Sequence, residues 1–100
     1  MSVDNKHERT NKMPIYYLHS QRIRLAYRIT HGIPIHKNQR WDAIAGLKEL
    51  YLVRNYWPLD DAVEAINSLG GILSNEVTRW ALTVTSTELE EQTDTALNLI

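Results

Sequence analysis

The sequence has no cysteine, which excludes disulfide bonds, thiolate metal sites and a cysteine nucleophile. It also has no long apolar run, because the longest are four residues, at 15–18 and 50–53. Runs this short exclude a membrane-spanning helix and the apolar core of a secretion signal, so we expect a cytoplasmic protein. Phenylalanine is missing as well, and each of the three tryptophans and five tyrosines therefore carries a polar atom that needs a partner.

The 100 residues, 43% of them hydrophobic, fit one domain with one modest core. Residues 1–13 have few apolar side chains and no helical or strand period, which predicts a disordered basic leader. Residues 14–100 are expected to form a single helical domain. A domain of this size has a net stability of about 5–15 kcal/mol, which leaves little room for a deep catalytic cavity.

Charge is divided along the chain although the total is only −1. Residues 1–40 carry eight basic and two acidic residues, a net charge of +6, and all four histidines. Residues 41–100 carry three basic and ten acidic residues, a net charge of −7. This division can draw an anionic partner to one end of the molecule, or pair two copies of the chain as a homodimer through opposite charges.

Residues 14–31 have both a helical and a strand pattern. As a helix, the segment has Pro14 in its first turn and Gly32 as its stop, and Arg22 lies within its apolar face. As a strand at 22–30, it alternates apolar residues with polar ones. The helix is favoured because Gln, Arg, Leu and Ala dominate the segment.

The next two helices have clearer boundaries. Asn38 is expected to cap a central helix over 39–54, with Trp41, Ile44 and Leu47 among its inward residues. Residues 59–69 predict a second helix with acids in its first turn, ended by the glycines at 70–71.

The C-terminal part predicts two more helices. Ser74 is expected to cap a helix over 75–83, while a strand at 80–85 is the alternative because Val and Thr favour strands. Thr87 and Glu90 form a capping-box pattern before a last short helix. The whole pattern predicts a mainly α fold, a bundle of about four to five short helices, with short strands at 22–30 and 80–85 as the alternative.

Enzymatic motifs are absent from the sequence. The glycine pair at 70–71 lacks the context of a phosphate-binding loop, and no GxSxG nucleophile elbow occurs. His31 and His36 lack the further ligands that zinc needs, and the carboxylates lie where helix N-termini favour them. We therefore expect no enzyme activity, no metal and no cofactor.

Binding chemistry is better represented. A helix over 14–31 places five residues along one exposed stripe: Tyr17, Gln21, Arg24, Arg28 and His31. A strand instead places Arg22, Arg24 and Arg28 on one face. In both geometries arginine guanidinium groups, whose planar forks suit phosphate oxygens, lie near an aromatic ring able to stack on a base. The predicted nucleic-acid contacts are Arg22, Arg24 and Arg28 for phosphates, with Tyr17 and Gln21 for bases.

Residues 62–82 resemble the helix-turn-helix unit of small repressors. The resemblance rests on Gly71 at the turn and on four apolar residues at packing positions: Ile66, Ile72, Val77 and Trp80. It implies that Asn75, Thr78 and Arg79 face the major groove. Asn67 departs from the small residue of that family. From residue 59 onward the chain has eight acids and one base, which repel phosphate unless the basic segment folds over the same face.

These observations predict a small regulator that binds nucleic acid, duplex DNA in the first instance, through its basic N-terminal segment. The alternative is an adaptor or inhibitor whose arginines meet an acidic protein, with Tyr56 or Trp57 as the anchor.

Overall fold

The computed structural model describes residues 18–99, so the predicted leader at 1–13 and the candidate Tyr17 lie outside the described residues. Within that range the fold is mainly α and contains no strand, which confirms the predicted fold class. Its elements are α2 (Ser20–Thr30), the 3₁₀ turn η2 (Lys37–Gln39), α3 (Arg40–Tyr56), α4 (Leu59–Asn67), α5 (Asn75–Thr83) and α6 (Ser86–Asn98).

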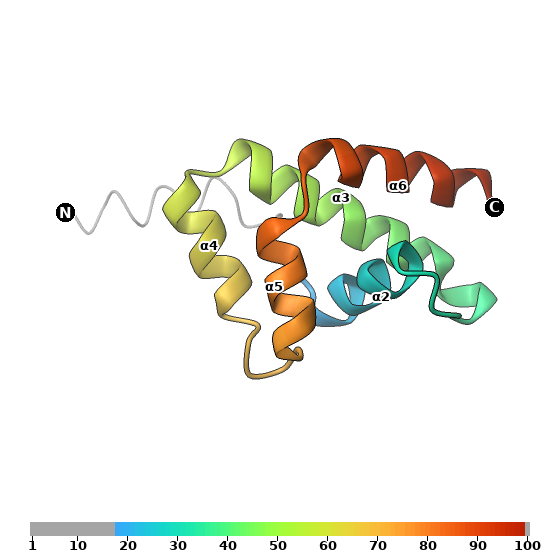
Figure 1. Cartoon of the computed structure of the whole chain (residues 1–100), viewed down its shortest axis with the longest axis horizontal. Coiled ribbons are helices and arrows are strands. Elements are labelled where there is room, and N and C mark those ends of the chain that lie inside the picture. The colour runs from blue at the N-terminus through green and yellow to red at the C-terminus, as the bar shows by residue number, and fades with distance from the viewer. Residues whose placement is uncertain (1–17, 100) are drawn as a thin grey trace.

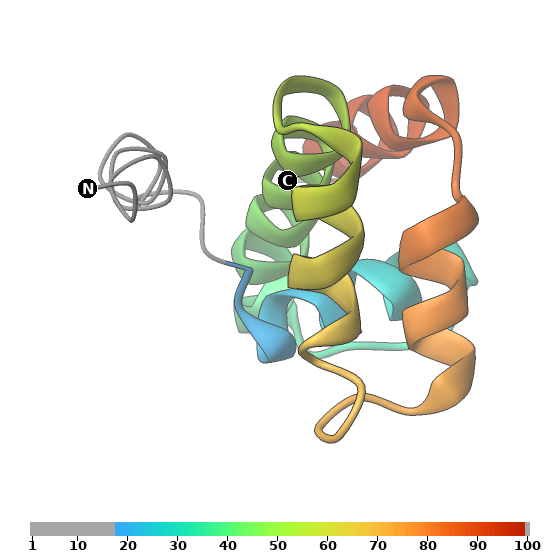
Figure 2. The ribbon, with the colours of Figure 1, turned by 90° about the vertical axis from the view of Figure 1, so that its left-hand side faces the viewer.

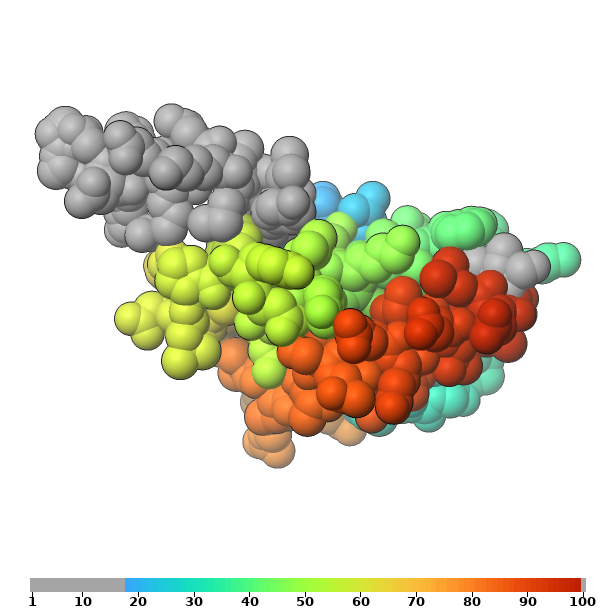
Figure 3. Space-filling view, turned by 90° about the horizontal axis from the view of Figure 1, so that it is seen from above, coloured from blue at the N-terminus to red at the C-terminus, as the bar shows by residue number. Residues whose placement is uncertain are grey.

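The long helix α3 is the central element of the fold (Figure 1). α2 and α6 both pack against it, and α6 runs alongside it in the view from above (Figure 3). α4 and α5 lie side by side and are joined by the loop 68–74 (Figure 2). α5 also packs against α2. The largest fully buried side chains come from α2, α3, α4 and α6, and each contributes about 1.5–3 kcal/mol by leaving water. The largest of them are Ile23, Ile44, Leu47, Leu50, Ile66 and Leu89.

α2 crosses α3 at very close range, because the crossing point on α3 is a glycine. A Cβ added to Gly46 would overlap the carbonyl group of Arg22 and would lie 3.2 Å from the Cβ of Ala26. Gly46 and Ala26 are both buried. The absence of a side chain at residue 46 therefore sets the distance between the two helices.

The helix favoured over the strand is the structure observed in both ambiguous segments. The alternative strands at 22–30 and 80–85 are absent, since the buried residues of α2 include Ile23, Ala26 and Tyr27, which follow a helical period. α2 also begins at Ser20, so Leu18 and His19 precede the helix rather than continue it from Pro14. The alternation of apolar residues in 22–30 does not reflect a strand. It arises because α2 is buried on more than one side, so that apolar residues also occur outside a single helical stripe.

The predicted caps are only partly right. Ser74 does cap α5, accepting a hydrogen bond from the backbone nitrogen of Val77 at 3.2 Å. Asn38 instead lies inside η2, which tightens the entry to α3. α6 is capped by Thr85, two residues before the predicted Thr87, and the Thr85 hydroxyl accepts from the backbone nitrogen of Glu88 at 3.0 Å.

The predicted core is wrong at the first turn of α3. Trp41, expected to face the interior, is 60% exposed in the first turn of α3. The chain before α3 passes through η2, so the first turn of α3 lies at the edge of the bundle. None of the helices within residues 18–99 combines the length and the apolar character needed to cross a membrane.

Candidate functional site

Arg24 and Arg28 lie on α2, a helix that has no acidic residue. The segment after α2 turns back at Gly32, which has a positive φ of 72°, and the backbone nitrogen of Ile33 donates to the Arg28 carbonyl at 2.9 Å. A left-handed residue of this kind is most easily a glycine. The turn lays the segment up to His36 along α2 and leaves a shallow groove of about 420 Å³ between them. The groove is lined by Gln21, Arg24, Leu25, Arg28, Pro34, Ile35, His36 and Gln39.

Neither Arg24 nor Arg28 forms an ion pair within residues 18–99. Arg28 is exposed, and its guanidinium has no hydrogen-bond partner in that range. Arg24 donates to the amide oxygen of Gln21 at 2.6 Å and to the carbonyl of Ile72 at 3.4 Å, both of them uncharged acceptors. Both arginines therefore keep their full charge at the groove, and Arg24 is held in place by its two acceptors.

Arg22, the third predicted phosphate contact, lies apart from this surface and is paired with carboxylates. It forms ion pairs with Glu49 and, at 3.8 Å, with Asp42, both on α3. The hydrogen bond and the charge of Glu49 raise the pKa of Arg22. His19 joins the same carboxylate, with its Nδ1 3.0 Å from the Glu49 oxygen. Arg22 lies on the side of α2 that faces α3, where the helical pattern had placed it within the apolar face.

The helices differ sharply in the sign of their charge. α2 has no acidic residue, while α4 and α6 have no basic one. The sequence contains no Asp or Glu between Glu8 and Asp42, although seven lysines and arginines fall in that interval. The positive potential around Arg24 and Arg28 is therefore little reduced by neighbours along the chain.

A cluster of three rings lies where α2 ends and α5 passes over it. The imidazole of His31 stacks on Tyr27, with ring centroids 3.9 Å apart, and Trp80 meets both rings edge-on. The phenol of Tyr27 donates to Glu76 on α5 at 2.6 Å, which raises the pKa of Tyr27. Beside the cluster is a groove of about 300 Å³, lined by residues of α2, α5 and the start of α6.

Sequence reasoning missed this second groove. Trp80 was expected to be a core residue, and it is half-buried instead, with part of its surface lining the groove. One feature of the sequence pointed to this groove. Tyr27 and His31 are four residues apart, a spacing that brings two rings together on one face of a helix.

The α4–α5 unit departs from the geometry of a helix-turn-helix. Residues 68–74 separate the two helices, whereas that motif has a turn of about three to four residues. Ile72, expected to be packed, is 62% exposed, because the longer loop carries it away from the core. Asn75 and Arg79 are exposed as predicted for a reading face, but the hydroxyl of Thr78 donates to the Ser74 carbonyl at 3.0 Å.

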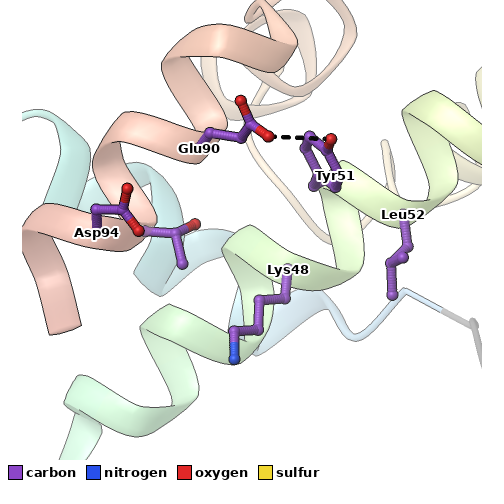
Figure 4. Close-up of a pocket in the computed structure, with 6 residues that line it drawn as sticks. Lys48, Tyr51, Leu52, Glu90 and Asp94 are labelled. Atoms are coloured by element: carbon purple, nitrogen blue, oxygen red, sulfur yellow. Dashed lines mark hydrogen bonds between the residues drawn. The ribbon is translucent and has the colours of Figure 1, made fainter.

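A third groove, of about 430 Å³, lies between α3 and α6 (Figure 4). Lys48, Tyr51 and Leu52 line it from α3, and Glu90 and Asp94 line it from α6. The phenol of Tyr51 donates to Glu90 at 3.2 Å, which raises the pKa of Tyr51. The acidic side chains of this groove make it unsuitable for an anion.

Within residues 18–99, no three His, Asp or Glu side chains come together as a set of metal ligands. The described residues thus include a basic groove without carboxylates, a groove beside the three-ring cluster, and an acidic groove between α3 and α6. Comparison of the sequence and the structure with known protein families, with curated proteins and with solved structures finds no match.

Proposed function

We propose that the protein is a cytoplasmic, non-enzymatic regulator that binds nucleic acid through Arg24 and Arg28. One observation carries the proposal: these two arginines lie one helical turn apart on α2 with no carboxylate partner within residues 18–99. Guanidinium groups bind phosphate oxygens through planar pairs of N–H donors, so two of them in this arrangement suit a phosphate backbone.

The surroundings of the two arginines support the same ligand. Lys37 follows the groove residue His36 at the start of η2, so one further cation lies next to the groove. The amide oxygen of Gln21 accepts a hydrogen bond from Arg24, so the two amide N–H groups of Gln21 remain as donors to a ligand. An extended polyanion contacts several such groups at once, whereas a single small anion contacts one or two.

The test is a salt titration of binding to fluorescein-labelled oligonucleotides, duplex and single-stranded, followed by fluorescence anisotropy. Arg24→Gln and Arg28→Gln should each weaken binding and reduce the log–log salt slope by about 0.9 for duplex or about 0.7 for a single strand. Lys48→Gln is the matched control, since Lys48 is an exposed cation in the acidic groove. Absence of binding at low salt, or equal losses for Lys48→Gln, would contradict the proposal.

Arg79→Gln in the same titration separates two modes of binding. Arg79 is exposed, and its guanidinium has no hydrogen-bond or ion-pair partner within residues 18–99. A loss limited to duplex DNA would indicate that α5 also enters the groove of the duplex. Because α4 and α6 carry only acidic charge, we expect Arg79→Gln to have a smaller effect than Arg28→Gln.

A protein-binding adaptor is the second candidate, and a specific surface favours it. At the junction of α3 and α4, Tyr56 is 69% exposed and Leu59 is 77% exposed. Trp57 is half-buried, so Tyr56 is the available aromatic anchor. If an acidic protein is the partner, a pull-down should lose the same band with Tyr56→Ala and with Arg28→Gln. Loss with neither variant would contradict the adaptor function.

A further inference from the structure

We infer that the nucleic acid is single-stranded, and that one unpaired base stacks on His31 and enters the groove beside Trp80. This inference rests on the proposed function and names its ligand more closely. It is carried by the geometry of the three-ring cluster and by the side chains that line the adjacent groove.

The outer face of the His31 ring is open. Tyr27 covers the other face, with the two planes 24° apart and their centroids 3.9 Å apart. The Trp80 centroid is 5.6 Å from Tyr27 and 6.0 Å from His31. A ring nearly equidistant from both members of a stack lies beside the stack and not on top of it. His31 is also exposed, so a flat ligand can continue the Tyr27–His31 stack outward.

The imidazole is held rigidly in this orientation. Its Nδ1 lies 2.7 Å from the carbonyl oxygen of Tyr27, which can only accept a hydrogen bond, so Nδ1 carries the proton. The hydroxyl of Thr30 lies 2.9 Å from the same nitrogen. Because the ring is fixed before a ligand arrives, stacking on it costs little conformational entropy.

The groove beside the stack has the chemistry of a base pocket. It is lined by His31, Trp80, Thr83, Val84, Thr85 and Glu88. The Glu88 carboxylate is exposed and repels phosphate, so the part of a nucleic acid that enters is the neutral base and not a phosphate. An ionised carboxylate only accepts hydrogen bonds, and guanine offers it two adjacent N–H donors where thymine offers one. We therefore expect a preference for guanine.

A single strand connects the two grooves. Arg28 lies in the last turn of α2, and His31 is the C-cap residue three positions later, so phosphates held at Arg24 and Arg28 place the next base near His31. In a duplex both faces of a base are covered by its neighbours, and extruding it costs a few kcal/mol. The stacking site therefore favours strands whose bases are already unpaired.

The experiment compares three labelled probes by fluorescence anisotropy: a short oligothymidylate, the same strand with one central guanosine, and the duplex of the latter. The guanosine strand should bind most tightly. His31→Ala should weaken its binding by at least about fivefold, the lower end for losing a base–aromatic stack, while His31→Phe should retain it. Glu88→Gln should reduce the guanosine preference. Trp41→Ala is the matched control, because it removes an exposed ring that lines neither groove.

Several outcomes would overturn the inference. They are duplex binding as tight as that of the guanosine strand, equal losses for both probes with His31→Ala, or a His31→Phe protein as weak as His31→Ala. Circular dichroism of each variant checks that the fold is retained. If Arg24→Gln and Arg28→Gln weaken binding while His31→Ala does not, the proposed function stands and this inference is wrong. If no probe binds the unaltered protein, the proposed function itself is wrong.

Discussion

Replacing Gly46 by alanine tests the close crossing of α2 and α3. The added Cβ would lie 2.6 Å from the carbonyl carbon of Arg22, below the 3.4 Å at which ordinary contact begins. The obstacle is backbone, so α2 itself must move. Overpacking of this kind costs about 3 kcal/mol at the upper end, and the better helix propensity of alanine returns about 1 kcal/mol. We expect Gly46→Ala to lower the free energy of unfolding by about 2 kcal/mol.

The assay is thermal unfolding followed by far-ultraviolet circular dichroism, in which this loss should lower Tm by about 8–16 °C. Gly71→Ala is the matched control, because residue 71 is exposed and has nothing within 4 Å of an added Cβ. Its φ is also not positive, so alanine should leave Tm unchanged or raise it slightly. A Gly46→Ala protein as stable as the original would refute the reasoning, since the two helices would then lie further apart.

Three further variants test individual hydrogen bonds. Arg54→Met removes a guanidinium that donates to two carbonyls at the end of α5, and urea unfolding should show a loss of about 1–3 kcal/mol. Ser74→Ala removes the α5 cap and should cost about 1 kcal/mol, whereas Asn38→Ala should leave Tm nearly unchanged. The bond from Tyr27 to Glu76 raises the pKa of Tyr27 above its unfolded value of 10.0, so its stabilisation is complete below pH 10 and lost as pH rises through the higher folded pKa. Unfolding of Tyr27→Phe should therefore depend less on pH above 10 than that of the original, and equal pH dependence would contradict this assignment.

The sequence was sufficient for the fold class and for most helices, because helical period and stop signals agree in them. α4 is the clearest case, since the acids of its first turn, its apolar spacing and the glycines at 70–71 all indicate one helix. Errors occurred where two local signals competed. Thr85 and Thr87 are both acceptable caps for α6, and only the packing of Leu89 into the core selects the earlier start.

The chemistry of the candidate site could be predicted from the sequence, but which residues belong to the site could not. A helical stripe containing Arg24 and Arg28 follows from residue spacing alone. Arg22 is neutralised by Glu49, which lies 27 residues further along the chain. The two side chains come into contact only when α2 packs on α3, so the sequence around Arg22 does not reveal the pair. The groove beside Trp80 likewise needs the ends of three helices to converge, and no local pattern reports such a convergence.

Segregation of charge among the helices gives this chain an electric dipole, although its net charge is only −1. A molecule with such a dipole experiences a torque in the field of a polyanion. The torque turns the α2 side of the molecule toward the polyanion before the two are in contact. Collisions are thereby oriented, and a larger share of them is productive. The torque fades once the Debye length, about 10 Å at 0.1 M salt, falls below the dimensions of the domain.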